Sequence, residues 1–266
     1  MASTTATAIP TYFDLSWAVI STIGLFNILI SLMVAGIANG FSRVLLVPLV
    51  VSAACALANG LCYVAYIAEY PAVNKAVAAI FASLGWTIQE GGLPFYGYMI
   101  LIPILRGCER RIFLAFFWGL TLITVALRGV ATSVEMLFTF QNTFSFDRYQ
   151  MINRRLCTTC FVTIALAECT TAVFLLREFR ASLRFSSMSP LSGGMLFHYL
   201  MRSTEIRVST LALIGIMRVV TFSYHAIGSG SAEGVASQLD RFAVTLQALF
   251  PIVMLQVCPP LKTSQR

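Results

Sequence analysis

Long hydrophobic stretches separated by short polar ones run along the whole sequence. Seven of them reach roughly 19 residues or more, the length that a helix needs to cross the hydrocarbon core of a membrane. Lipid offers the backbone no hydrogen-bond partner, and stretches this long lack the alternation of barrel strands, so each is expected to form a helix. The predicted spans are residues 15–38, 44–68, 77–104, 112–138, 156–176, 207–228 and 241–259.

The composition leads to the same fold class. Hydrophobic residues make up 58% of the chain and charged residues only 11%, whereas a soluble domain has about 25% charged residues. We therefore predict an all-α polytopic membrane protein, a single domain over residues 1–266 that forms a bundle of seven transmembrane helices in the lipid bilayer. The net charge of +7 is interpreted as basic loops facing the cytoplasm, and no nucleic-acid partner is expected.

The distribution of Lys and Arg between the loops predicts the orientation. With the N-terminus outside or in the lumen and the C-terminus in the cytoplasm, eleven of these residues lie in cytoplasmic segments and five in outer ones. The other two lie inside spans. The longest connection, residues 178–206, contains FSSMSPLSGG and is predicted to be a flexible loop.

Five ionisable side chains fall deep inside the predicted spans: Glu90, Arg128, Glu135, Glu168 and Arg218. A charge at the centre of a bilayer helix costs about 2.5–3.5 kcal/mol, so these groups are expected to face the bundle interior or water. Their depths predict two ion pairs, Glu90 with Arg128 and Glu168 with Arg218. One carboxyl then lacks a cationic partner, and such a group in apolar surroundings can stay protonated and act as an acid. The alternative is that all five only tie helices together.

The sequence around Glu90, GWTIQEGGLPFYGYMIL at positions 85–101, makes this residue the leading candidate. Pro94 has no N–H to bond the Glu90 carbonyl, and two glycines loosen the turn between them, so a break in the helix is expected. Trp86 lies one turn before Glu90, on the same face. The alternative is a proline kink that only shapes the bundle, with the glycines allowing close packing.

An acid beside aromatic rings can protonate an apolar substrate and stabilise the cation that forms. This chemistry defines the candidate site. The predicted catalytic residues are Glu90, with Glu168 or Glu135 in support, and the predicted substrate-binding residues are Trp86, Gln89, Tyr96 and Tyr98.

Several other kinds of chemistry lack their residues in this chain. The three Asp residues, at positions 14, 147 and 240, are too scattered to hold Mg²⁺ and a diphosphate. No phosphate-binding G-x-x-x-x-G-K is present, and no lysine lies inside a span to form a Schiff base with retinal. Cys157 and Cys160 form a single pair, which provides too few ligands for a metal. We therefore expect no metal and no cofactor.

In length, number of spans and acids at mid-membrane depth, the chain resembles the small seven-span membrane-bound terpene cyclases of fungal secondary metabolism. That family's pattern includes a Trp–Glu pair in an early span, whereas here Trp86 and Glu90 lie four positions apart. The resemblance implies a metal-independent enzyme that protonates an epoxide or alkene of a lipophilic, prenylated substrate and cyclises or isomerises it. Such an enzyme is expected in the endoplasmic reticulum rather than the plasma membrane.

Two other classes of protein fit the same pattern of spans. A seven-span receptor or sensor has the same topology, but the receptor motifs are missing. A small proton-coupled transporter would use Glu90 to carry the proton, and a helix broken at mid-span is a transporter feature. No internal repeat is visible in the sequence, which counts against a transporter.

Overall fold

Seven α-helices make up the computed structural model of this protein, which describes residues 11–37, 42–67, 70–141, 146–186, 194–227 and 235–255. No strand occurs in these ranges, so the prediction of an all-α fold is confirmed for them. Each helix covers most of one predicted hydrophobic stretch. The helices are α1 (Thr11–Ile37), α2 (Arg43–Tyr66), α3 (Ala72–Leu101), α4 (Gly107–Gln141), α5 (Phe146–Ser186), α6 (Gly194–Ile227) and α7 (Val235–Leu255).

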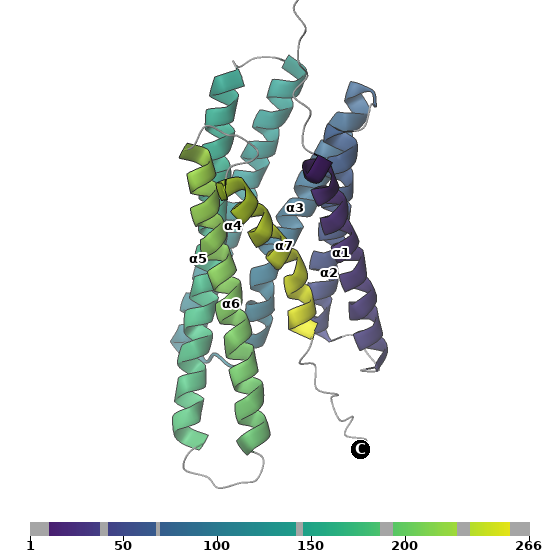
Figure 1. Cartoon of the computed structure of the whole chain (residues 1–266). Helices are drawn as coiled ribbons and strands as arrows, with labels where there is room; N and C mark the ends of the chain where they lie inside the picture. The colour runs from purple at the N-terminus through teal and green to yellow at the C-terminus, as the bar shows by residue number, and fades with distance from the viewer. Residues whose placement is uncertain are drawn as a thin grey trace, which may run out of the picture.

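Successive helices run in opposite directions along one bundle (Figure 1). In this view α1 and α2 lie on one side, α4, α5 and α6 lie on the other, and α3 and α7 pass between them. α3 packs against α2, α4 and α5, while α7 packs against α1, α2 and α6. α3 and α7 therefore join the two sides of the bundle.

Five of the described helices contain a segment long and apolar enough to cross a membrane, namely α1, α2, α4, α5 and α7. Their outer surfaces are apolar: Phe26, Met33 and Leu122 are 66%, 67% and 66% exposed. Polar groups turn inward instead, and the buried Asn27 side chain donates a hydrogen bond from Nδ2 to the Ala248 carbonyl, 2.6 Å away, which ties α1 to α7. Apolar groups outside and polar groups inside are typical of a membrane-embedded protein in contact with lipid.

The predicted loop over residues 178–206 is wrong for most of its length. α5 continues to Ser186 and α6 begins at Gly194, so both helices extend well beyond their hydrophobic segments (Figure 1). The continuation of α5, REFRASLRFS, contains three Arg together with single Glu, Ala and Leu residues, all of which favour helix even without an apolar face. Pro190 and most of the Ser and Gly residues of FSSMSPLSGG lie between the end of α5 and the start of α6 in the sequence.

The predicted break in α3 is also wrong, because the helix runs without interruption through Pro94. Two glycines of α3 act in packing: a Cβ added at Gly85 would lie 2.9 Å from the Ala58 Cβ, and one at Gly92 would lie 2.7 Å from Val51 Cγ2. Both contacts are with α2. The small residues therefore bring α2 and α3 close together, which is the alternative considered for this sequence.

At the end of the bundle where α3 ends and α4 begins, the interior is filled. We call this region the packed end; its core comprises Tyr98, Leu101, Phe113, Phe117 and Leu175, all 0–9% exposed. The Tyr98 and Phe117 rings stack with centroids 4.6 Å apart. The opposite end, where α1 begins and α2 ends, contains a cavity, and we call it the pocket end.

Candidate functional site

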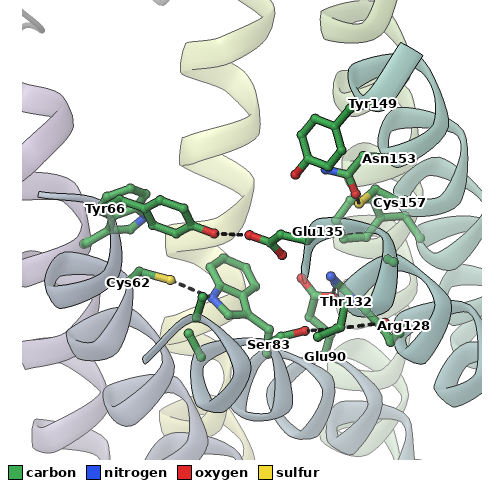
Figure 2. Close-up of a pocket in the computed structure, with 16 residues that line it drawn as sticks. Cys62, Tyr66, Ser83, Glu90, Arg128, Thr132, Glu135, Tyr149, Asn153 and Cys157 are labelled. Atoms are coloured by element: carbon green, nitrogen blue, oxygen red, sulfur yellow. Dashed lines mark hydrogen bonds and ion pairs between the residues drawn. The ribbon is translucent and has the colours of Figure 1, made fainter. Parts of the chain in front are cut away.

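A cavity of about 450 Å³ lies between α1, α2, α3, α4 and α5 at the pocket end (Figure 2). This volume is in the range of pockets that bind small molecules. Its walls carry the aromatic rings of Trp17, Tyr66, Trp86, Tyr149 and Phe161. The other lining residues are Cys62, Ala79, Ala82, Ser83, Glu90, Arg128, Ala131, Thr132, Glu135, Asn153 and Cys157.

Regular spacing along each helix brings these side chains to the cavity. α4 contributes Arg128, Ala131, Thr132 and Glu135, which are spaced at i, i+3, i+4 and i+7 and therefore share one face. The lining residues of α3 and α5 follow the same helical period. Small side chains occupy several of these positions, including Ala131, and they leave the volume that the cavity occupies.

The floor of the cavity is an ionic cluster centred on Glu90, which is only 1% exposed. Its Oε2 pairs with Nη2 of Arg128, so the predicted pair between these residues is confirmed. Its Oε1 accepts a hydrogen bond from Nη1 of Arg218 at 2.8 Å. The same Arg218 nitrogen lies 2.6 Å from Oε1 of Gln247, and the guanidinium lies 4.3 Å from the centroid of the Phe161 ring. Glu90 is thus the counter-ion of two arginines.

The predicted pair between Glu168 and Arg218 is wrong, because Arg218 pairs with Glu90 instead. Glu168 faces a separate cavity of about 10 Å³, which Glu90, Arg218 and Gln247 also line. The Oε2 atom of Glu168 is buried and has no hydrogen-bond partner among the described residues. Glu90, Glu168 and Arg218 all lie at a similar depth in their spans, so depth alone does not show which carboxylate pairs with Arg218. The rotation of α6 about its own axis decides which of the two carboxylates this arginine reaches.

Glu135 lies two helical turns from Arg128 on the cavity-lining face of α4. The Tyr66 hydroxyl donates a hydrogen bond across the cavity to Glu135 Oε1, with 2.6 Å between the oxygens (Figure 2). This bond joins the end of α2 to α4. A phenol that donates to one carboxyl oxygen fixes the direction in which the other oxygen points.

Weaker polar contacts hold the rest of the wall. Ser83 and Thr132 share a hydrogen bond with 2.6 Å between their oxygens, which joins α3 to α4. The Trp86 indole nitrogen donates to the sulfur of Cys62 at 3.3 Å. Within the described residues, no group of three His, Cys, Asp or Glu side chains is placed to hold a metal ion.

The cavity brings together four of the predicted site residues and leaves five outside. Trp86, Glu90, Arg128 and Glu135 line it, whereas Gln89, Tyr96, Tyr98, Glu168 and Arg218 do not. Tyr98 belongs to the packed end, and Tyr96 is buried in a hydrophobic cluster between α2, α3, α6 and α7. Gln89 is 2% exposed, and its Oε1 accepts no hydrogen bond from the described residues.

Sequence reasoning did not find Trp17, Tyr66, Tyr149 and Phe161, which form most of the aromatic wall. The first three lie near the ends of their helices, where Trp and Tyr commonly anchor a protein at the membrane interface. The signal that would have found Tyr149 is the four-residue spacing of Tyr149, Asn153, Cys157 and Phe161, a single face of α5.

No model of a known protein family matches this chain, and a comparison with curated proteins also finds no match. The chemistry of the site therefore has to be inferred from its geometry.

Proposed function

We propose that this protein spans the membrane seven times and that its cavity is the active site of an acid-catalysed cyclase or isomerase. The proposed substrate is lipophilic and prenylated, and the proposed location is the endoplasmic reticulum. The N-terminus is proposed to face the lumen and the C-terminus the cytoplasm. The antiparallel bundle supports seven spans, because α3 and α6 pack against helices that carry apolar spans (Figure 1).

The observation that carries the enzymatic proposal is the pair of Tyr66 and Glu135 in an aromatic cavity. A carboxyl group held by a phenol at 2.6 Å is a positioned proton donor. The rings of Trp86, Tyr149 and Phe161 face the same space and would stabilise a carbocation through their negative faces. Acid and cation-stabilising groups together are what a proton-initiated cyclisation requires.

Glu135 is the proton donor in this proposal, in place of the leading sequence candidate. Glu90 is bound by two guanidinium groups, which stabilise its ionised form, so this carboxylate carries no proton to donate. Glu168 faces the smaller cavity and does not line the larger one. Of the three predicted acids, Glu135 alone combines access to the cavity with a neighbouring hydroxyl donor.

The proposed reaction balances without a co-reactant. Protonated Glu135 transfers its proton to the oxygen of an epoxide or to an alkene carbon of the substrate, which leaves a carbocation. A neighbouring alkene attacks the cation, and a new carbon–carbon bond forms. A proton then leaves an adjacent carbon and returns to the Glu135 carboxylate. The product is an isomer of the substrate, and the enzyme is restored.

The test is a product assay in microsomes that carry the wild type, Glu135→Gln, Tyr66→Phe or the control Glu109→Gln. Glu109 pairs with Arg177 at 2.7 Å at the packed end, so its loss leaves the cavity intact. Epoxidised prenyl substrates are added, and mass spectrometry detects isomers of unchanged mass. We expect Glu135→Gln to lose activity by about a hundredfold or more, and Tyr66→Phe by about tenfold.

An isomeric product that persists in Glu135→Gln would overturn the role of this residue and return the acid to Glu90 or Glu168. The absence of a product with every substrate would contradict the cyclase proposal. It would then favour the receptor alternative, because the cavity lies at the end of the bundle that the basic loops place outside the cytoplasm.

The proposed orientation has its own test, which uses Cys108 at the packed end. Its side chain is exposed at the start of α4, on the side proposed to be cytoplasmic. In sealed microsomes a membrane-impermeant maleimide is expected to label the wild type and to give less label with Cys108→Ser. A Cys108 signal that appears only after the membrane is permeabilised would reverse the orientation.

A further inference from the structure

The two arginines at the floor of the cavity have different surroundings. The side chain of Arg218 is 6% exposed, and it contacts Glu90, Gln247 and the face of Phe161. Its single positive charge balances the single negative charge of Glu90. The side chain of Arg128 is 15% exposed and lines the large cavity. Only its Nη2 pairs with Glu90, and its Nε, like that of Arg218, has no hydrogen-bond partner among the described residues, so the difference between the two arginines is that Arg128 borders the large cavity.

Arg128 is thus a second cation on a carboxylate that is already paired. The nearest further acid of the cluster, Glu168, forms no ion pair with either arginine in the described residues, and its Oε2 is unpartnered. A buried carboxyl without a cation is least costly in its neutral form. The cluster then carries one positive charge that no protein carboxylate balances. An unbalanced buried charge is strongly unfavourable.

We infer that the cavity binds a lipophilic carboxylic acid, whose carboxylate pairs with Arg128 at the floor. This inference rests on the proposed function and names the class of its substrate. A guanidinium matches a carboxylate with two parallel hydrogen bonds, which would use donor groups of Arg128 that Glu90 does not occupy. A single negative charge also balances the cluster, whereas the second charge of a dianion such as a phosphate would be unbalanced and would be repelled by Glu90.

The same contact determines which part of the substrate reacts. Arg128 and Glu135 lie seven residues apart on one face of α4, so their positions differ by about 10 Å along the helix axis. A ligand held by its carboxylate at Arg128 extends along the aromatic wall toward Glu135. The acid would therefore protonate a double bond or epoxide about 10 Å from the carboxylate, at the far part of the chain.

Binding to the purified full-length protein in detergent tests this inference without any turnover. Four probes share one hydrocarbon chain: farnesoic acid, its methyl ester, farnesol and farnesyl phosphate. The dissociation constants are measured by quenching of tryptophan fluorescence, since Trp17 and Trp86 line the cavity. The wild type is expected to bind the acid about tenfold or more tightly than the ester or the alcohol, and more tightly than the phosphate.

Arg128→Gln is expected to remove this preference for the acid, while the control Arg111→Gln, an exposed arginine of the packed end, retains it. Equal binding of acid and ester by the wild type would overturn the inference, and this comparison needs no variant that might misfold. Tighter binding of the phosphate, a preference that survives Arg128→Gln, or no binding of any probe would also overturn it. Tight binding of the acid without an isomeric product would instead contradict the proposed enzyme while leaving the binding site in place.

Discussion

The two ends of the bundle are both rich in aromatic residues, yet one is filled and the other is hollow. At the packed end the Phe95, Tyr98, Phe113 and Phe117 rings contact one another, with centroids 4.6–6.1 Å apart. At the pocket end the rings of Trp86, Tyr149 and Phe161 instead surround about 450 Å³ of space. The number of aromatic residues therefore does not distinguish a core from a site.

The residues that face the rings make the difference. At the packed end Leu101 and Leu175 fill the space between the rings, and both are fully buried. At the pocket end the corresponding space is bordered by alanines and by polar pairs that meet across it, such as Tyr66 with Glu135. Small residues and hydrogen bonds that cross the space thus mark the site more clearly than the rings do.

The largest effect is expected from Glu90→Gln, which removes the charge that holds the floor of the cavity. Two guanidinium groups would then lie close together without a carboxylate. Removal of one partner from a buried ion pair costs about 3–5 kcal/mol. We expect a sharp loss of folded protein, measured as the monodisperse fraction in detergent and as a lower temperature of unfolding.

The matched control is Glu135→Gln, which changes a carboxyl in the same cavity without disturbing the floor. It is expected to unfold within a few degrees of the wild type. If Glu90→Gln were as stable as Glu135→Gln, the ionic cluster would not hold the helices together. Glu90 at the floor of the cavity could then no longer be assigned a structural role distinct from that of Glu135 in its wall.

The seven helices and one of the ion pairs at the floor of the cavity could be predicted from the sequence. Long apolar stretches specify helices because lipid leaves the backbone no alternative, and all seven appear. The polar extensions of α5 and α6 were missed, because a search for long apolar stretches does not detect a helical segment that has a polar sequence. Glu90 and Arg128 were paired by depth alone. The position of Arg218 depends on how α6 rotates, which no single span encodes.

The second prediction applies one substitution, Ala to Leu, at both ends. Ala172 lies in the filled core of the packed end, where a larger side chain forces its neighbours apart at a cost of about 1–3 kcal/mol. Ala131 lines the cavity, where the added volume meets open space and filling it stabilises by about 0.5–2 kcal/mol. We expect the temperature of unfolding to fall for Ala172→Leu and to rise or stay unchanged for Ala131→Leu.

Binding sharpens the same comparison. Ala131→Leu is expected to abolish binding of the farnesoic acid probe, because the leucine takes up the space that the ligand needs. Ala172→Leu is expected to bind the probe normally wherever it remains folded. Equal destabilisation by the two substitutions would indicate that the cavity is closed by movement of its walls, and the distinction between a filled and a hollow end would fail.

The smallest change in the temperature of unfolding is expected from a glycine-to-alanine substitution at the contact between α2 and α3, the two helices that run from the packed end to the pocket end. A Cβ at Gly85 would lie 2.9 Å from the Ala58 Cβ and 3.2 Å from the Ala54 carbonyl oxygen, so Gly85→Ala has to push α3 away from α2. The cost of this overpacking is about 1–3 kcal/mol, and the higher helix propensity of alanine offsets it by about 1 kcal/mol. At Gly36 an added Cβ meets nothing within 4 Å, so Gly36→Ala gains only the higher helix propensity of alanine.

We expect Gly85→Ala to unfold at a lower temperature than the wild type and Gly36→Ala to unfold at the same temperature or a higher one. A Gly85→Ala protein as stable as Gly36→Ala would mean that α2 and α3 separate without cost, and that the width of the cavity between them is not set by their glycine contact.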